Sequence, residues 1–147
     1  MTSAIIAYGA SVELSANGTT GWAEIPEITG IPVPATETDY VDVTSLDSPN
    51  GYREYIPGLK DAGNLTIPAN YTHNGYQTLV AYQNSGDLAH FRVTLAPAPD
   101  QSAGDVFTFA GYITVAVDAG DVGGKVSMSI NVRISGDVTW AEGAAVV

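Results

Sequence analysis

Two histidines are the first residues of this chain that could bind a metal or move a proton. His73 and His90 are the only histidines, and nothing in the sequence places them side by side. Two ordinary polar histidines are therefore the favoured interpretation. The chain has no cysteine, which excludes thiol catalysis, disulfides, zinc–thiolate sites and iron–sulfur clusters. The sequence predicts no cofactor and no metal.

Two pairs of aspartates could chelate calcium or act as an acid and a base. These pairs are Asp39/Asp42 and Asp118/Asp121. Neither pair has the ligand density of a calcium loop, so carboxylates of turns and of the surface are the simpler interpretation. The run Gly120–Gly124 matches no phosphate-binding fingerprint, and no Gly-x-Ser-x-Gly motif occurs. We therefore predict a role in assembly rather than an enzyme.

The charge balance restricts the partners. The 147 residues include 5 Lys+Arg and 16 Asp+Glu, a formal charge of −11. Such a chain is not expected to bind nucleic acid through a basic face, because phosphate binding requires cations. It is also not expected to bind anionic membranes, and no stretch approaches the roughly 20 apolar residues of a membrane helix.

Alternation of apolar and polar residues dominates the pattern, and it predicts long strands. The clearest runs are Asn64–Tyr71, Ala89–Leu95, Asp105–Asp118 and Lys125–Ser135. Pro68 assigns the first of these to a sheet edge or a bulge, because proline cannot donate a ladder hydrogen bond.

The remaining elements complete a mainly β fold. We predict strands over Ser11–Ser15 and Tyr40–Thr44, an extended segment over Trp22–Ile31, and one helix around Tyr76–Asn84. The predicted architecture is an antiparallel β-sandwich or partly rolled barrel with one short α-helix. We expect residues 1–147 to form a single domain, with 141–147 (or the whole run from Trp140) as a short C-terminal extension.

The longest segment without a clear pattern is Ser45–Ala62. It contains Tyr52, Tyr55, Ile56 and Leu59, which are too apolar for a free linker. Loops of this length in compact domains are usually functional or disordered. We interpret Ser45–Lys60 as an assembly loop that reaches an adjacent subunit or ring; the alternative is packing onto its own domain.

Several stretches together resemble the tail tube proteins of long-tailed bacteriophages. The strand-and-loop motif is Val41–Asp47, the run Tyr55–Gly63 carries Ile-Pro-Gly-Leu-x-Asp, and the next strand is Leu65–Tyr71. The resemblance continues through Phe109–Val115 and ends at Ile134–Thr139. It spans nearly the whole chain, and the order of the motifs is more specific than any one of them.

The resemblance implies a structural virion protein. Such proteins form six-fold rings that stack into a hollow, non-contractile tube through which DNA passes into the host cell. The inner tubes of type VI secretion machines and the tails of gene transfer agents are similar. The implied partners are further copies of the chain and the tape measure, tail terminator and distal tail proteins. DNA is only transiting cargo, and assembly in the host cytoplasm is implied.

A pore-facing surface is expected to carry small and polar side chains, since bulky apolar ones would be wet and would narrow the channel. The alternating strands offer one such face, and its members are Thr108, Tyr112, Thr114, Ser127, Ser129, Asn131 and Arg133. The competing interpretation puts this face on the tube exterior. Lys125 and Arg133 share it, so the lumen would be mixed in charge at that level.

Two other functions fit the same pattern of strands. A monomeric carbohydrate-binding β-sandwich could use Trp22, Tyr112 or Trp140 as an aromatic platform. A small hydrolase could use the Asp or Glu pairs. Light scattering distinguishes the first of these from a tube protein, because rings and monomers differ in size.

Overall fold

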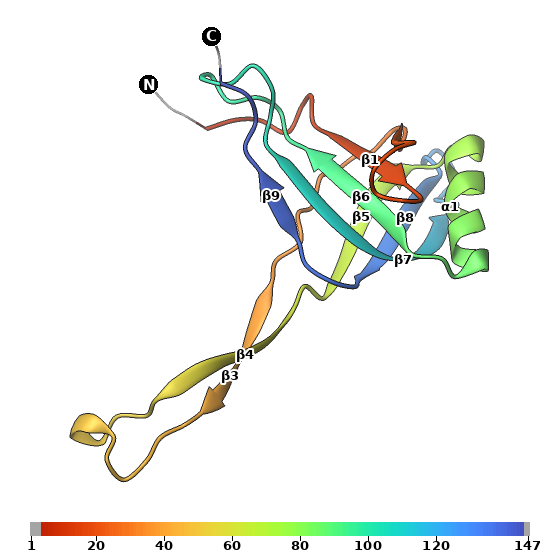
Figure 1. Cartoon of the computed structure of the whole chain (residues 1–147). Helices are drawn as coiled ribbons and strands as arrows, with labels where there is room; N and C mark the ends of the chain where they lie inside the picture. Colours follow the sequence, from red (N-terminus) through yellow and green to blue (C-terminus); the bar gives the residue numbers. More distant parts are fainter. Residues whose placement is uncertain (1–3, 146–147) are drawn as a thin grey trace.

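The computed structural model describes residues 4–145. Figure 1 shows a β-rich body, one helix at its side, and a long hairpin that projects away from the body. The strands are β1 (Ser11–Ser15), β2 (Ala23–Glu24), β3 (Glu37–Asp42), β4 (Tyr55–Asp61), β5 (Asn64–Asn70), β6 (Ala89–Thr94), β7 (Val106–Asp118), β8 (Ser127–Ile134) and β9 (Thr139–Ala141). The helices are α1 (His73–Ser85) and the short 3-10 helix η1 (Pro49–Gly51).

The longest strand, β7, is the centre of the body sheet, whose order is β2-β1-β6-β7-β8-β5. Its first half pairs with β6 on one side and β9 on the other. Its second half pairs with β8, and on the opposite side α1 packs against it. There the Gln83 side chain accepts a hydrogen bond from the Val115 backbone N–H at 3.0 Å. The exchange of partners occurs at Gly111, where a Cβ would lie only 2.6 Å from the Arg133 carbonyl oxygen.

One short segment closes this sheet into a rolled barrel. The segment is Ala23–Thr29. Its strand β2 pairs with β1, and the Ile25 N–H donates to the Val12 carbonyl. A few residues later, the Thr29 N–H donates to the Pro68 carbonyl of β5. The sequence predicts a sheet edge or a bulge at Pro68, and β5 is indeed the last strand in the sheet order, with only the short segment at Thr29 bonded to its outer side. The backbone of Pro68 points away from β8, so its missing N–H costs the ladder nothing.

The strand alternation places one set of side chains inside. The fully buried members include Val12, Ile67, Phe91, Ile130 and Val132, and Leu79 of α1 packs among them. Phe91 and Phe109 stack with ring centroids 5.3 Å apart. The mainly β fold with one helix is therefore confirmed, as a rolled antiparallel sheet.

The helix is longer than predicted, because its ends are set by capping groups. Thr72 accepts a hydrogen bond from the Gly75 N–H, and Gly86 closes the C-terminus in the left-handed conformation. The first turn, His73–Gly75, carries a glycine and no apolar face, so periodicity alone did not include it. No helix in the described residues is long and apolar enough to span a membrane.

The projecting hairpin is called the arm here, and comprises Glu37–Asp61. The expectation that Ser45–Ala62 is irregular throughout is wrong for its second half, where Tyr55–Asp61 forms β4 and pairs with β3. The strand β3 begins at Glu37 rather than Tyr40. A register shift occurs near Asp39, where Gly58 and Leu59 of β4 form a bulge. This irregularity and Pro57 explain why no alternation was visible there.

The chain after Ser135 also returns to the body. Strand β9 pairs Trp140 with Phe107, and Ala145 forms a bridge with Gln101. The Asp105 carboxylate accepts the Gly143 N–H at 2.8 Å and the Gln101 side-chain amide at 2.7 Å. The segment from Trp140 to Ala145, expected to be an extension, is thus bonded to the sheet as far as the structure describes it.

We expect the closed barrel to depend on its buried aliphatic side chains. Ile130 is fully buried, so Ile130→Ala should lower the free energy of unfolding by about 2–5 kcal/mol. Val122 is fully exposed in the β7–β8 turn, and Val122→Ala should change it by less than about 0.5 kcal/mol. Urea denaturation of dilute protein measures both values. Equal values for the two variants would contradict this account of the core.

Candidate functional site

The arm presents apolar side chains on both of its faces. The register places Tyr40, Tyr55 and Pro57 on one face, and Val41 and Ile56 on the other. A two-stranded hairpin is marginally stable at best in water. Within the described residues, β3 and β4 pack extensively against each other, and neither packs extensively against another helix or strand. Its apolar side chains are therefore available to another surface.

The exposure of the arm excludes the alternative that it packs onto its own domain. Tyr52 is 73% exposed and Leu59 84%, and Tyr55 and Ile56 are each half exposed. Sequence reasoning selected these four but missed Tyr40, Val41 and Val43, and also Leu46, which is fully exposed at the tip. The sequence predicts a strand over Tyr40–Thr44, but only the projection of β3 from the body reveals that this strand is exposed.

The two edges of the arm differ. The Val43 N–H donates to the Glu54 carbonyl, so the backbone groups of Tyr40 and Asp42 point to the outer edge of β3. The same alternation directs Pro57, which has no N–H, to the outer edge of β4. Proline at an edge prevents pairing with another strand. The outer edge of β3 remains open to a further strand.

The base of the arm is held to the body by one ion pair. Arg133 Nη2 lies 3.2 Å from Asp61 Oδ2, and Asp61 Oδ1 accepts the Gly63 N–H at 2.8 Å. Gly63 has φ +70°, a conformation that favours glycine, and its carbonyl accepts the Ile134 N–H. These groups connect the base of the arm to the end of β8.

Hydrogen bonds and charge lower the pKa of two arm carboxyls. The Gly63 N–H, followed by the Arg133 guanidinium, holds the pKa of Asp61 below its ordinary value of 3.8. Thr44, through its hydroxyl and its N–H, lowers the pKa of Asp42, and Arg53 adds to the effect. Both aspartates remain charged at neutral pH.

The predicted polar face exists as one side of the body sheet. The register pairs Tyr112 with Arg133, Thr114 with Asn131, and β5 adds Thr66, whose hydroxyl donates to Asn131 Oδ1 at 2.9 Å. Thr108, Ser127 and Ser129 lie on this side as well and are half-buried. All seven residues named from the sequence therefore share one side of the sheet.

Only part of the polar face is open. Over β1 and β6, Trp22 stacks on Arg92, whose guanidinium carbon lies 4.4 Å from the ring centroid, and Arg92 pairs with Glu13 at 2.7 Å. The turn at Gly18 comes close to His90. The open part is formed by β5, β8 and the second half of β7.

The open part of the polar face carries less unbalanced positive charge than the sequence indicated. Arg133 is paired with Asp61, so its positive charge is balanced. Lys125 lies before β8 rather than within it.

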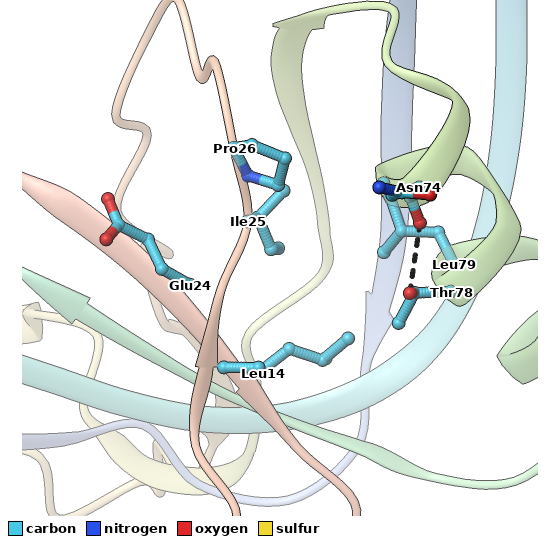
Figure 2. A pocket seen from close by; sticks show the side chains of 9 residues that line it. Leu14, Glu24, Ile25, Pro26, Asn74, Thr78 and Leu79 are labelled. Atoms are coloured by element: carbon cyan, nitrogen blue, oxygen red, sulfur yellow. Dashed lines mark hydrogen bonds between the residues drawn. The ribbon is translucent and has the colours of Figure 1, made fainter.

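A groove of about 240 Å³ lies beside the N-terminus of α1. Figure 2 shows Leu14 as its floor, with Ile25 and Pro26 on one side and Asn74, Thr78 and Leu79 on the other, while the Glu24 carboxylate points away. The Thr78 hydroxyl is already bonded to the Asn74 carbonyl at 3.0 Å. The groove is apolar and presents no acid, base or nucleophile.

The candidates for chemistry are dispersed. Asp39 and Asp42 occupy opposite faces of β3, because an odd number of steps separates them. The Asp118 carboxylate accepts the Gly120 N–H, and the Asp121 carbonyl accepts the Gly124 N–H. Both residues therefore stabilise the turn between β7 and β8. Among the described residues, no group of three or more His, Asp or Glu side chains could hold a metal ion.

The three aromatic residues considered for a sugar platform do not form one. Trp22 is stacked on Arg92. Tyr112 lies on the polar side of β7, whereas Trp140 pairs with Phe107 on the opposite side.

The model of the lambda phage tail tube protein family matches residues 8–141. The chain belongs to the lambda phage tail tube protein family. The resemblance stated from the sequence is confirmed, and the protein is a structural component of phage-type tails. No curated protein sequence matches the chain.

Solved structures share the fold of this tail tube protein. The tail of an empty gene transfer agent particle matches with TM-score 0.72 and 20% identity, over 94% of this chain and 99% of that chain. The virion of a native gene transfer agent particle matches with TM-score 0.71 and 18% identity, over 94% and 99%. The SPP1 tail tube matches with TM-score 0.67 and 15% identity, over 96% and 81%.

We expect Arg133→Gln to raise the pKa of Asp61 toward 3.8 without reaching it, because the Gly63 N–H, the larger cause, remains. A lowered folded-state pKa stabilises the protein above pH 3.8, and this contribution is lost as the pH falls through the folded value. The variant should therefore lose less stability on acidification than the unmodified protein. A carboxyl-carbon NMR titration measures the pKa directly. An unchanged pKa would mean that the ion pair does not hold the arm.

Proposed function

We propose that this tail tube protein self-assembles into six-fold rings that stack into a hollow tube, and that the tube conducts DNA from the virion into the host cell. The observation that carries the proposal is the arm, whose apolar side chains are exposed on both of its faces, Tyr52 and Leu59 among them. The family and the shared fold support it, and one structural neighbour is a tail refined with C6 symmetry. The chain has no enzymatic role in this proposal.

The arm supplies the energy of assembly. Burying a side chain such as Tyr55 or Ile56 is worth roughly 1.5–3 kcal/mol. Several such side chains on each arm, repeated in every subunit, exceed the repulsion between acidic copies that salt partly screens. The arm therefore reaches an adjacent subunit or ring, as the sequence suggested.

The open polar face is proposed as the lumen. Thr114, Asn131 and Thr66 on this face are exposed, small and uncharged, and Tyr112 is larger but also uncharged. Arg133 is balanced by Asp61, so the face offers few cations to the phosphates of a passing duplex. Tape measure, tail terminator and distal tail proteins are the further partners we expect, and assembly in the host cytoplasm completes the proposal.

Deletion of Pro49–Glu54 tests the role of the arm. The truncated subunit should keep the body fold, because these residues are exposed and lie outside β3 and β4. It should form no tubes at concentrations where the unmodified protein does, as seen by negative-stain microscopy. Deletion of Val122–Gly123 from the exposed β7–β8 turn is the control and should leave assembly intact. Normal tubes from the arm deletion would refute the role of the arm.

The lumen assignment is tested by adding cations. Ser129→Lys with Asn131→Lys should leave tubes intact but slow DNA delivery, because each cation is repeated around every ring and binds phosphate. Gln77→Lys with Asn84→Lys adds the same charge on the exposed side of α1 and should have no such effect. Delivery rates measured with both particles decide the question. Equal rates would place the polar face outside the lumen.

A further inference from the structure

A second exposed apolar surface lies near the start of the chain. We call it the N-terminal patch: Ile5, Ile6, Tyr8 and the adjoining groove. Ile6 is 73% exposed and Tyr8 89%, on a turn closed by the bond from the Ala10 N–H to the Ala7 carbonyl. The groove has a volume of about 210 Å³, and its walls are Ile5, Ile6, Ala7, Ala10, Ile31, Leu95 and Ala96. This volume is below the roughly 300 Å³ at which small-molecule pockets begin.

The patch and the arm lie at opposite ends of the molecule. Figure 1 shows the arm tip at the lower left and the chain from residue 4 onward entering at the upper left, at the end of the body away from the base of the arm. One copy cannot bring its own arm tip to its own patch. Contact between the two surfaces therefore needs two copies, arranged head to tail. Such a heterologous contact leaves one free arm and one free patch, so it propagates into an open stack.

Charge favours the patch as the surface that receives the arm. The arm carries six acidic and two basic residues between Glu37 and Asp61. The other acidic side chains of a chain with net charge −11 would repel it. The sequence holds no charged residue before Glu13, and the groove is lined only by Ala, Ile and Leu. The patch is thus an apolar surface free of charged side chains in a chain of net charge −11.

We propose that the N-terminal patch of one copy is the docking surface for the arm tip of the next copy along the tube. The exposed side chains of the tip, Leu46 and Tyr52, supply groups of a size that the groove can hold. This inference rests on the proposed function, and it adds the identity of the surface that the arm contacts. It also gives the stack a direction, because every junction joins an arm to a patch.

Charge-introducing variants separate the two surfaces. Ile6→Glu with Tyr8→Glu disables the patch, and Leu46→Glu with Tyr52→Glu disables the arm tip. Each pair should raise the protein concentration needed for tube formation by roughly tenfold or more, measured by light scattering and microscopy. Gln77→Glu with Asn84→Glu adds the same charge on α1 and should form tubes like the unmodified protein. Tubes from the patch variant at the unmodified concentration would overturn the inference.

A mixture of the two defective proteins tests the pairing itself. The patch variant keeps an intact arm and the arm-tip variant keeps an intact patch, so together they should form one junction and stop. Analytical ultracentrifugation should detect paired particles only in the mixture. If the unmodified protein forms neither rings nor tubes, the proposed function fails. If it forms tubes but the mixture does not associate, only the arm–patch pairing fails.

Cross-linking gives a second measurement that does not depend on disabling either surface. The chain lacks cysteine, so Leu46→Cys and Tyr8→Cys each introduce a single reactive thiol. Assembled mixtures of the two, treated with a short flexible bis-maleimide, should yield a cross-link between positions 46 and 8 of different copies. Gln77→Cys in place of Tyr8→Cys should yield none. Absence of the 46–8 product from intact tubes would contradict the docking surface.

Discussion

A β-sheet must pair the backbone groups at its edges and cover its apolar face, and the body and the arm meet this constraint differently. In the body, the segment from Ala23 to Thr29 bonds to β1 on one side and to β5 on the other, so the sheet closes on itself. The arm has only two strands, with apolar side chains on both faces and one edge open. The body covers its own apolar face, whereas the apolar side chains of the arm stay exposed on both faces.

Much of the body could be predicted from the sequence, because a strand that is buried on one side alternates apolar and polar residues. This alternation is present in β1, β5, β6, β7 and β8, and the ends of these strands were predicted to within about two residues. The closing strand β2 has two residues and β9 has three, too few to show a period. Their positions follow from long-range pairing, as with Trp140 opposite Phe107.

The arm could be predicted only in part, for a physical reason. Its side chains are covered by no part of the described chain, so no period of two marks them, and Pro57 and Gly58 interrupt β4. The apolar content of Tyr52 to Leu59 is visible in the sequence, and the partner surface that it suggests stays a prediction. The ion pair between Asp61 and Arg133 is not visible there, because 72 positions separate the two residues. Only the pairing of β5 with β8 brings them together.

Repulsion between the acidic copies opposes the attraction between their exposed apolar surfaces. The locations of these surfaces determine what kind of assembly is possible. The net charge of −11 makes separate copies repel each other, at a range limited to about 8–10 Å by physiological salt. Apolar contacts act only where two surfaces fit, so they define which surfaces meet. If the contacting surfaces lie at opposite ends of the molecule, each junction leaves new free ends. Nothing in such a contact limits the number of copies, so the length of the tube has to be set by other components of the tail.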